Sequence, residues 1–279
     1  MKKPARVTGI DITGRGYSTV TFKPAPPDSG ITFIRDDLPG RPGVECRPEY
    51  ARADHRWTSL DKEGVRIEHT EHILAAAAGL GIDNLLIHAD GPYLPVVTGF
   101  SSGGFVQALL EAEPVFQDRP REYFYVPEAR WVMGSFDYGG ERYDSILLAL
   151  PSKEFKLTYL MDYPGKQIST QAYSFAVGGD EDFALGPAAA RSYIIDYEYA
   201  RVADLIGRGM EDCLVFPGAA TDLRWNNEPA RHKLLDLLGD MAILGRAVKG
   251  HFIGIRTGHK MNIQMCKELA KLMKGDIPS

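Results

Sequence analysis

The segment RIEHTEHILAAAAGLGIDNLLIHAD, residues 66–90, decides the fold because it contains a core helix and the strand that follows it. After His72 comes a run of alanine and branched apolar residues, which is typical of a buried helix. Two acids and two histidines stand directly before this run: Glu68, His69, Glu71 and His72. Ionisable groups are costly to bury without a partner, so their position needs a chemical explanation.

A second segment has the same order of features. In RHKLLDLLGDMAILGRAVKGHFI, residues 231–253, a histidine is followed by an apolar helix, a glycine and a strand. Two copies of one structural unit that face each other would produce this likeness, and so would the composition that helices share. Both interpretations stay open at this stage.

The chain divides into two halves at a linker, residues 114–123 (PVFQDRPREY). Apolar periodicity predicts where the strands and helices lie. Before the linker we expect strands over 18–25, 30–37 and 83–90, a helix after His69 and a helix over 105–113. After it we expect strands over 122–134, 143–151, 155–164 and 248–256, and helices over 229–245 and 262–274. Strands first and helices later, twice over, predict an α+β protein of two domains, residues 1–120 and 121–279.

Composition excludes several classes of function. The 279 residues are 44% hydrophobic and carry a formal net charge of -5, so the chain has no basic field that would attract nucleic acid. Its three cysteines lie far apart, which argues against a disulfide framework or a zinc-thiolate site and fits a reducing compartment. No apolar stretch has the length of a secretion-signal core or a transmembrane helix. We therefore expect a cytoplasmic protein without a transmembrane segment.

A polar stripe marks the helix over residues 229–245. His232, Asp236 and Asp240 recur at every fourth position, which places them along one side of the helix. A solvated stripe on an amphipathic helix is one interpretation. The other is a buried cleft that binds a cation, because apolar residues occupy nearly all of the remaining circumference. Both interpretations remain open on this evidence alone.

The two helices together offer three metal ligands. A hydrolytic zinc commonly takes three protein ligands from histidine and carboxylate and leaves the fourth position to water. His72, His232 and Asp236 complete such a set, and Glu71 beside His72 could act as general base. The competing use of His69 and His72 as a ligand pair three residues apart stays open.

Glu68 and His69 have a simpler interpretation. We expect both to be exposed residues of the first helical turn. An inverted-zincin motif would need a histidine where this chain has Glu68, so that class of metalloprotease is excluded.

The segment GIRTGHKMN, residues 254–262, adds one more histidine. A histidine after a glycine in a loop usually has no special role. Close to a zinc, however, His259 would be a candidate general acid, cationic when the Asp240 carboxylate orients it. Lys233, next to His232, would supply a local cation for an oxyanion or a phosphate.

Three of these segments carry a resemblance to a known family. Residues 70–87, 231–245 and 250–262 resemble the three signature regions of UDP-3-O-acyl-N-acetylglucosamine deacetylase, a zinc amidase of lipid A biosynthesis. The likeness extends over nearly the whole chain, through TGIDITG (8–14), FKPAPPDSGITFIRDDLP (22–39), WTSLDKEGVRI (57–67), ARSY (190–193) and DLRWNNEPARHK (222–233). Several such blocks in the same order are far more specific than a single motif.

The resemblance implies a fold, a cofactor and a set of roles. The implied fold has two similar α+β domains, each a mixed sheet with helices, packed helices-inward as a β-α-α-β sandwich with the active site between them. The implied cofactor is Zn²⁺, and the implied substrate is a small acylated UDP-amino sugar, bound by a protein that is expected to be a monomer. The implied zinc ligands are His72, His232 and Asp236, and the implied catalytic residues are Glu71 as base, His259 as acid, Lys233 and Asp240.

The chain also departs from the family pattern. Thr98 stands where the family usually has an aspartate, and Ser192 stands where the family has a threonine that helps hold the reacting carbonyl oxygen. His69 replaces a small residue, and the early family histidine is missing from DITGRG (11–16). The connection after ARSY, which normally carries an insert that forms the acyl-chain passage, is short. These changes leave the expected chemical centre intact and affect the choice of substrate.

The sequence therefore predicts zinc-dependent hydrolysis of the acetamide of UDP-3-O-acyl-N-acetylglucosamine. Glu71 would take a proton from the attacking water, Lys233 and Ser192 would stabilise the oxyanion with zinc, and His259 would protonate the leaving amine. One alternative is a paralogue that deacetylates another N-acetylated nucleotide sugar or glycolipid. Another is a catalytically silent protein that binds an acylated nucleotide sugar, but the intact general base argues against it.

Overall fold

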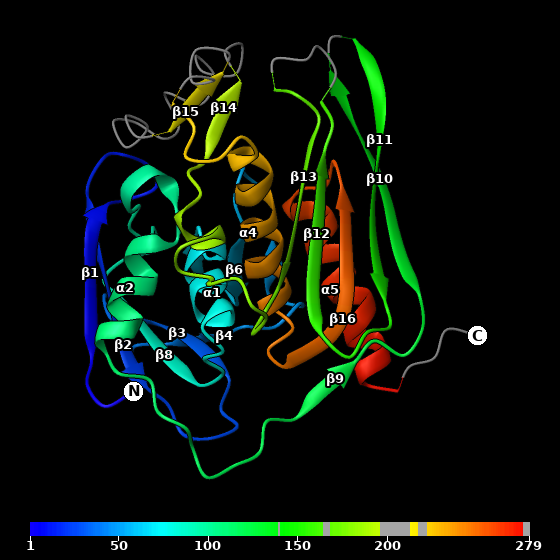
Figure 1. The fold of residues 1–279 in the computed structure, drawn as a ribbon. Helices are drawn as coiled ribbons and strands as arrows, with labels where there is room; N and C mark the ends of the chain where they lie inside the picture. The colour runs from blue at the N-terminus through cyan, green and yellow to red at the C-terminus, as the bar shows by residue number, and fades with distance from the viewer. Residues whose placement is uncertain (139, 164–167, 196–212, 217–221, 276–279) are drawn as a thin grey trace.

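The structure is a computed structural model that describes residues 1–138, 140–163, 168–195, 213–216 and 222–275. Within these ranges it contains two large mixed sheets, two small sheets and four α-helices (Figure 1). The large sheets lie on opposite sides of the molecule, with helices packed between them (Figure 1). The predicted α+β class is confirmed.

The first large sheet has the strand order β1-β2-β8-β3-β4. Its strands are β1 (Ala5–Ile10), β2 (Tyr17–Pro24), β8 (Leu85–Ala89), β3 (Ile31–Arg35) and β4 (Gly43–Glu45). The pair β3 and β8 is parallel, whereas the other neighbours are antiparallel. Because side chains alternate between the two faces of a strand, Phe22, Phe33 and Ile87 all point inward, and none is exposed to solvent.

The second large sheet repeats this order as β10-β11-β16-β12-β13. Its strands are β10 (Arg130–Tyr138), β11 (Glu141–Leu150), β16 (Ala247–Ile255), β12 (Phe155–Met161) and β13 (Gln171–Ala176). Again one central pair, β12 with β16, is parallel, and its flanking pairs are antiparallel. The short strand β9 (Tyr123–Tyr125) extends β16 in parallel.

Two small sheets bring further segments to the helices. One consists of β5 (Ala51–Arg52), β6 (Ser59–Lys62) and β7 (Val65–Glu68), and the other of β14 (Tyr193–Ile195) and β15 (Leu214–Phe216). Strand β7 leads almost directly into the first helix. His69 makes the turn between them with a φ of 67°, in the left-handed region that few non-glycine residues adopt.

The helices are α1 (Glu71–Gly79), α2 (Gly103–Glu111), α4 (Glu228–Ala242) and α5 (His259–Met273), with short 3₁₀ turns η1 (Thr98–Phe100) and η2 (Pro187–Ala189). Helices α1 and α4 pack closely against each other at the centre (Figure 1). A Cβ atom on Gly239 would lie 2.0 Å from the carbonyl oxygen of Glu71. Only glycine therefore allows α4 to approach the start of α1 this closely.

The predicted elements are present in the structure, and two of them differ in their bounds. The single strand expected over 122–134 is two strands, β9 and β10, because Pro127 lies between them and cannot donate a ladder hydrogen bond. The last helix begins at His259 instead of 262. The strands that were not predicted are β1, β4, β5, β6, β7, β13, β14 and β15. Across the described residues, no helix is both long and apolar enough to cross a bilayer. The domain boundary after residue 120 stays a prediction.

Candidate active site

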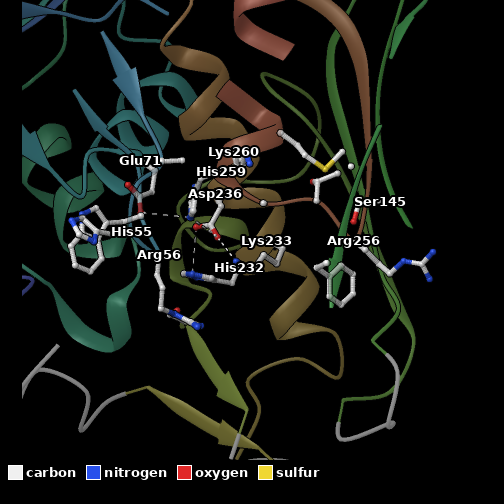
Figure 2. Close-up of a pocket in the computed structure, with 18 of the residues that line it drawn as sticks. His55, Arg56, Glu71, Ser145, His232, Lys233, Asp236, Arg256, His259 and Lys260 are labelled. Carbon is white, nitrogen blue, oxygen red and sulfur yellow. Dashed lines mark hydrogen bonds and ion pairs between the residues drawn. The ribbon is translucent and has the colours of Figure 1, made fainter. Parts of the chain in front are cut away.

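A cleft of about 930 Å³ lies between the two halves of the chain. The first half lines it with the loop before β6 and the start of α1, and the second half with β10, β11, α4 and the start of α5. Figure 2 shows side chains from α1, α4 and α5 pointing toward one another in this cleft. The residues predicted from the sequence as ligands, base and acid all line it, whereas Asp240 lies behind His259.

The predicted metal ligands lie together. The ligand atoms of His72, His232 and Asp236 are all within 4.8 Å of one another, and all three residues are buried. The Nε2 atoms of His72 and His232 lie 3.3 Å and 3.5 Å from Asp236 Oδ1. Two imidazoles and one carboxylate converge from two helices, which is a donor set suited to zinc.

The surroundings fix the orientation of His232. Its Nδ1 lies 3.1 Å from the carbonyl oxygen of Ala190, which accepts a hydrogen bond and leaves Nε2 free to face the cleft. Burial lowers the pKa of His232 to about 4, so the ring is neutral at physiological pH, as a ligand must be. The next residue, Arg191, binds Glu228 through Nε–Oε1 at 3.0 Å. This ion pair holds the Ala190 segment against the first turn of α4.

Glu71 is held by one carboxylate oxygen and offers the other to the cleft. The backbone N–H of Thr58 donates to Oε2 at 3.0 Å. The other oxygen, Oε1, lies 3.9 Å from the Nε2 atoms of both His259 and His69. Burial raises the pKa of Glu71 to about 7, which matches a general base that works near neutral pH.

His259 is the first residue of α5 and carries the opposite charge. Its Nδ1 donates to Asp240 Oδ2 at 2.8 Å, and its Nε2 faces the cleft. Burial alone would lower its pKa, but the Asp240 carboxylate outweighs burial and raises it to about 9. Asp240 is itself held by Thr58 Oγ1 at 2.6 Å and by Asn262 Nδ2 at 2.8 Å. The ring is therefore cationic at neutral pH and fixed in direction.

Lys233 and Ser192 also line the cleft. The Lys233 ammonium lies 2.9 Å from Asp236 Oδ2. Burial disfavours the Asp236 carboxylate, yet Lys233 and the nearby histidines hold its pKa well below the usual range. The backbone N–H of Ser192 donates to the carbonyl oxygen of Gly99 at 2.8 Å, which fixes the hydroxyl-bearing residue to the turn that contains Thr98.

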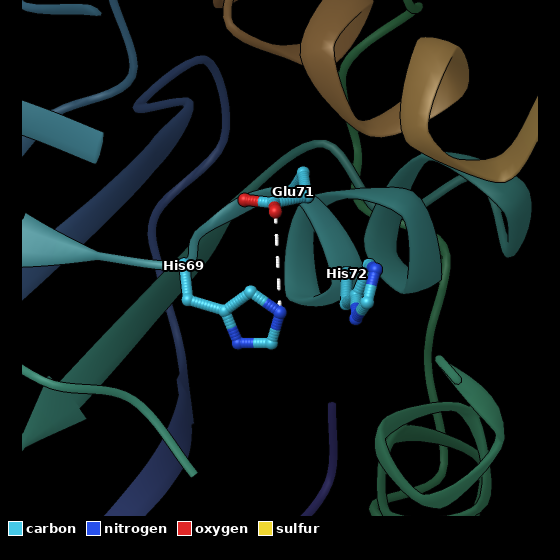
Figure 3. A group of neighbouring side chains, drawn as sticks. All are labelled: His69, Glu71 and His72. Atoms are coloured by element: carbon cyan, nitrogen blue, oxygen red, sulfur yellow. Dashed lines mark ion pairs between the residues drawn. The ribbon is translucent and has the colours of Figure 1, made fainter. Parts of the chain in front are cut away.

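The prediction that Glu68 and His69 are exposed is wrong. Their exposed fractions are 5% and 4%. Trp57 Nε1 donates to Glu68 Oε2 at 2.7 Å, and Arg66 binds the other oxygen, so this carboxylate is buried with partners. His69 lies beside Glu71 and His72 (Figure 3), because β7 and its positive φ turn the ring into the cleft instead of toward solvent.

His69 also belongs to a second possible ligand group. The ligand atoms of His69, Glu71 and His72 lie within 4.8 Å of one another (Figure 3). Among the described side chains, Nδ1 of His69 and Nδ1 of His72 are buried without a hydrogen-bond partner. The use of His69 and His72 as a ligand pair therefore stays a prediction that the geometry permits.

Several supporting residues were missed by the sequence analysis. Thr58 holds both Glu71 and Asp240, Asn262 holds Asp240, and the pair of Arg191 and Glu228 supports His232. All four lie inside the quoted family-like segments, which was the only available signal. The short connection after ARSY falls mostly on residues 196–212, outside the described part of the chain.

Known proteins resemble this chain over almost all of its length. A family model described as UDP-3-O-acyl N-acetylglycosamine deacetylase matches residues 1–271. A UDP-3-O-acyl-N-acetylglucosamine deacetylase of Bdellovibrio bacteriovorus is 32% identical over 276 residues, which cover 96% of this chain and 88% of the relative. The protein of the same name from Thermosynechococcus vestitus is 32% identical, with 96% and 92% covered. A bifunctional enzyme LpxC/FabZ of Chlorobaculum tepidum is 31% identical over 95% of this chain, which spans only 62% of that relative.

Proposed function

The chain belongs to the UDP-3-O-acyl N-acetylglycosamine deacetylase family, and we propose that its cleft hydrolyses the acetamide of UDP-3-O-acyl-N-acetylglucosamine. The products are acetate and the UDP-linked sugar with a free amine, a step of lipid A biosynthesis. One observation carries the proposal. Helices from two halves of the chain bring two imidazoles and a carboxylate together beside an acid-base pair of opposite charge.

The donor set fits zinc. His72, His232 and Asp236 supply two nitrogens and one oxygen, and the carbonyl of Ala190 fixes the tautomer of His232. Zinc bound by these residues would supply a Lewis acid that activates water and polarises the amide carbonyl.

Glu71 and His259 divide the proton transfers. Glu71 Oε1 takes the proton of the attacking water, because Thr58 holds only the other oxygen. His259 Nε2, 3.9 Å from that oxygen, gives its proton to the amine as the C–N bond breaks. Asp240 keeps the ring charged and aimed, and makes no bond to the metal in this assignment.

Lys233 and Ser192 stabilise the oxyanion. The ammonium lies beside Asp236, so it is positioned at the metal ligands before substrate binds. The Ser192 hydroxyl occupies the position of the family's threonine and lines the same cleft. A preorganised cation and a hydroxyl at this point lower the energy of the charge that develops on the carbonyl oxygen.

We further propose that the two halves are copies of one unit. The support is the shared strand order of the large sheets, each with one parallel central pair. In this arrangement the units pack as a β-α-α-β sandwich, helices inward, with the active site between residues 1–120 and 121–279. The cytoplasmic location and the monomeric state stay predictions.

Acetate release tests the function. Zinc-loaded protein should release acetate from UDP-3-O-acyl-N-acetylglucosamine and much less from the same sugar without its acyl chain. Protein with Glu71→Gln serves as the matched control, since it keeps the shape of the side chain and loses the base. Equal turnover of both sugars would favour the paralogue with another substrate, and no turnover by zinc-loaded protein would favour the silent binder.

A further inference from the structure

Among the residues that the structure describes, no helix covers one face of the second large sheet. All four described α-helices lie on its inner side (Figure 1). On the opposite side, the strand pairings align two rows of apolar side chains across β10, β11 and β16. We call this surface the outer face; it consists of Met133, Ile146 and Ile255 in one row and Trp131, Leu148 and Ile253 in the next. Trp131 is 62% exposed and Met133 is 65% exposed.

An apolar surface of this kind marks an interaction site. Soluble proteins rarely expose large contiguous apolar patches unless a partner or a membrane covers them. The two rows are continuous because each residue faces its neighbour directly across the ladder, as Trp131 faces Leu148 and Leu148 faces Ile253. The alternating inward residues, such as Leu147 and Phe252, are fully buried, so the outer residues are not needed for the core of the sheet.

The border of the outer face is basic on one side. His251 and Lys156 are paired in the adjoining row, and Lys249 follows on β16. Tyr125 of β9 is paired with Lys249 and is 56% exposed. On the opposite border, the next rows pair Ser135 with Asp144 and Asp137 with Arg142, and Asp162 forms an ion pair with Arg256 at 2.9 Å, so the basic side of the outer face is the one that adjoins β9. An apolar centre that contains tryptophan, with tyrosine and lysine at the edge, is the composition that suits a membrane-water interface with anionic lipid.

The outer face also reaches the cleft. Met133 belongs to both: it is the exposed end of one apolar row and it lines the cleft. If the protein acts on an acylated sugar, as its proposed function states, the substrate's acyl chain partitions into a bilayer. A surface that rests on that bilayer next to the mouth of the cleft would present the cleft to the substrate.

We propose that the outer face of β10, β11 and β16 docks reversibly on the surface of an anionic lipid bilayer. Trp131 and its apolar neighbours enter the interface, and Lys156 and Lys249 meet the lipid phosphates. The binding is peripheral, because it uses a sheet face and spans nothing. It combines apolar burial with attraction to anionic lipid, the two terms that govern interfacial binding.

Vesicle sedimentation tests the docking. The full-length protein is mixed with phosphatidylcholine vesicles, with and without phosphatidylglycerol as anionic lipid, and the bound fraction is measured. We expect binding to the anionic vesicles to exceed binding to neutral ones by about tenfold and to weaken at high salt. Trp131→Glu should reduce binding to anionic vesicles by about tenfold or more, whereas Trp131→Phe should retain it.

Matched variants on other surfaces test whether a loss of vesicle binding is specific to the outer face. Phe116→Glu makes the same change in charge at a fully exposed aromatic on another surface and should leave binding unchanged. Lys156→Gln should weaken binding about fivefold, and Lys267→Gln, on the exposed side of α5, should not. The lysine pair keeps the test valid even if Trp131→Glu fails to fold.

Three results would overturn the proposal. The first is a wild-type protein that does not bind anionic vesicles. The second is an equal loss of binding in Phe116→Glu and Trp131→Glu. The third is light scattering that shows a dimer dissociated by Trp131→Glu, which would assign the face to a second copy of the chain.

Separate measurements test the docking proposal and the deacetylase proposal, so either one can be contradicted without the other. The vesicles contain no nucleotide sugar, so binding is measured without turnover. Trp131 does not line the cleft, so Trp131→Glu should leave acetate release from a water-soluble, short-chain substrate unchanged. Docking without acetate release would contradict the enzyme assignment alone, and acetate release without docking would contradict the membrane surface alone.

Discussion

Helices α1 and α4 occupy equivalent places beside sheets of the same strand order, but they carry different chemistry. His72 in α1 corresponds to His232 in α4, and seven residues later each helix has a glycine, Gly79 or Gly239. Both glycines lie where a neighbour is close: an added Cβ would lie 2.3 Å from the Phe183 side chain or 2.0 Å from the Glu71 carbonyl oxygen, and only the second contact is with backbone. The two helices therefore share the spacing from histidine to glycine, and their sheets share a strand order.

The functional side chains are not shared. One position before the histidine, α1 has the acid Glu71 and α4 has Arg231. Four positions after it, α1 has Ala76 and α4 has the proposed ligand Asp236. Neither helix alone holds the three proposed ligands and the proposed base, so the proposed site forms only where the two helices meet. Four predictions test this division of labour, starting with the largest expected effect.

Removing the carboxylate that α4 adds should abolish the metal site. Asp236→Ala makes the fourth position after the histidine alanine in both helices and leaves two imidazoles as ligands. We expect zinc content to fall well below one per protein and acetate release to fall by about a thousandfold or more. Metal analysis after dialysis checks this, with Lys267→Gln as a folded control. Full zinc occupancy in Asp236→Ala would assign the third ligand elsewhere, for example to His69.

Removing the base that α1 adds should have a different signature. Glu71→Gln keeps the size of the side chain and a Thr58 contact but cannot take a proton. We expect kcat to fall by about a hundredfold or more with zinc occupancy retained. Parallel metal analysis and kinetics distinguish the two variants. Loss of zinc from Glu71→Gln would mean that Glu71 is a ligand and that base and ligand have been confused.

The sequence predicted the parts of this comparison that depend on local pattern. The helices α1 and α4 and the strands β8 and β16 follow from strong apolar periodicity, and the ligand stripe of α4 follows from its four-residue spacing. Burial of Glu68 was not predictable, because it depends on Trp57 and Arg66 across a hairpin whose strands are short and partly polar. The sheet orders likewise depend on pairings between strands distant in sequence. The predicted last helix began at residue 262, so His259 was placed in the connection before it. In the structure Gly258 is the N-cap and His259 is the first residue of α5.

The shared glycine gives a third test, with a moderate effect. Gly239→Ala places a methyl group against the backbone of Glu71, so α4 and the start of α1 must separate. We expect a loss of about 1–3 kcal/mol in the free energy of unfolding and weaker zinc binding, since the ligands come from both helices.

Gly79→Ala is the matched change in α1. It should destabilise the protein through Phe183 while leaving zinc affinity unchanged, because Gly79 lies at the far end of α1 from His72. Equal loss of zinc affinity in both variants would show that global destabilisation, not helix spacing, controls the metal site.

The fourth prediction, with the smallest expected effect, concerns Asp240. This aspartate lies eight positions after the histidine of α4, where the equivalent residue of α1 is Leu80. The Glu71 pKa is about 7 and the His259 pKa is about 9, so kcat/KM should rise as Glu71 ionises and fall as His259 loses its proton. Both apparent values belong to the coupled site. In Asp240→Asn the carboxylate that raises the His259 pKa is gone, so the basic limb should move to lower pH.

The same variant should change how stability depends on pH. The folded pKa of His259 lies above its ordinary value of 6.5, so its contribution to stability is complete below pH 6.5 and is lost as the pH rises through 9. Asp240→Asn should remove this dependence, which melting temperatures measured across that range would reveal. Asp240 is assigned no bond to zinc, so metal content should stay intact. A basic limb that does not move in a folded, zinc-loaded variant would show that another group charges His259, and the functional difference between α1 and α4 would then reduce to Glu71 and Asp236.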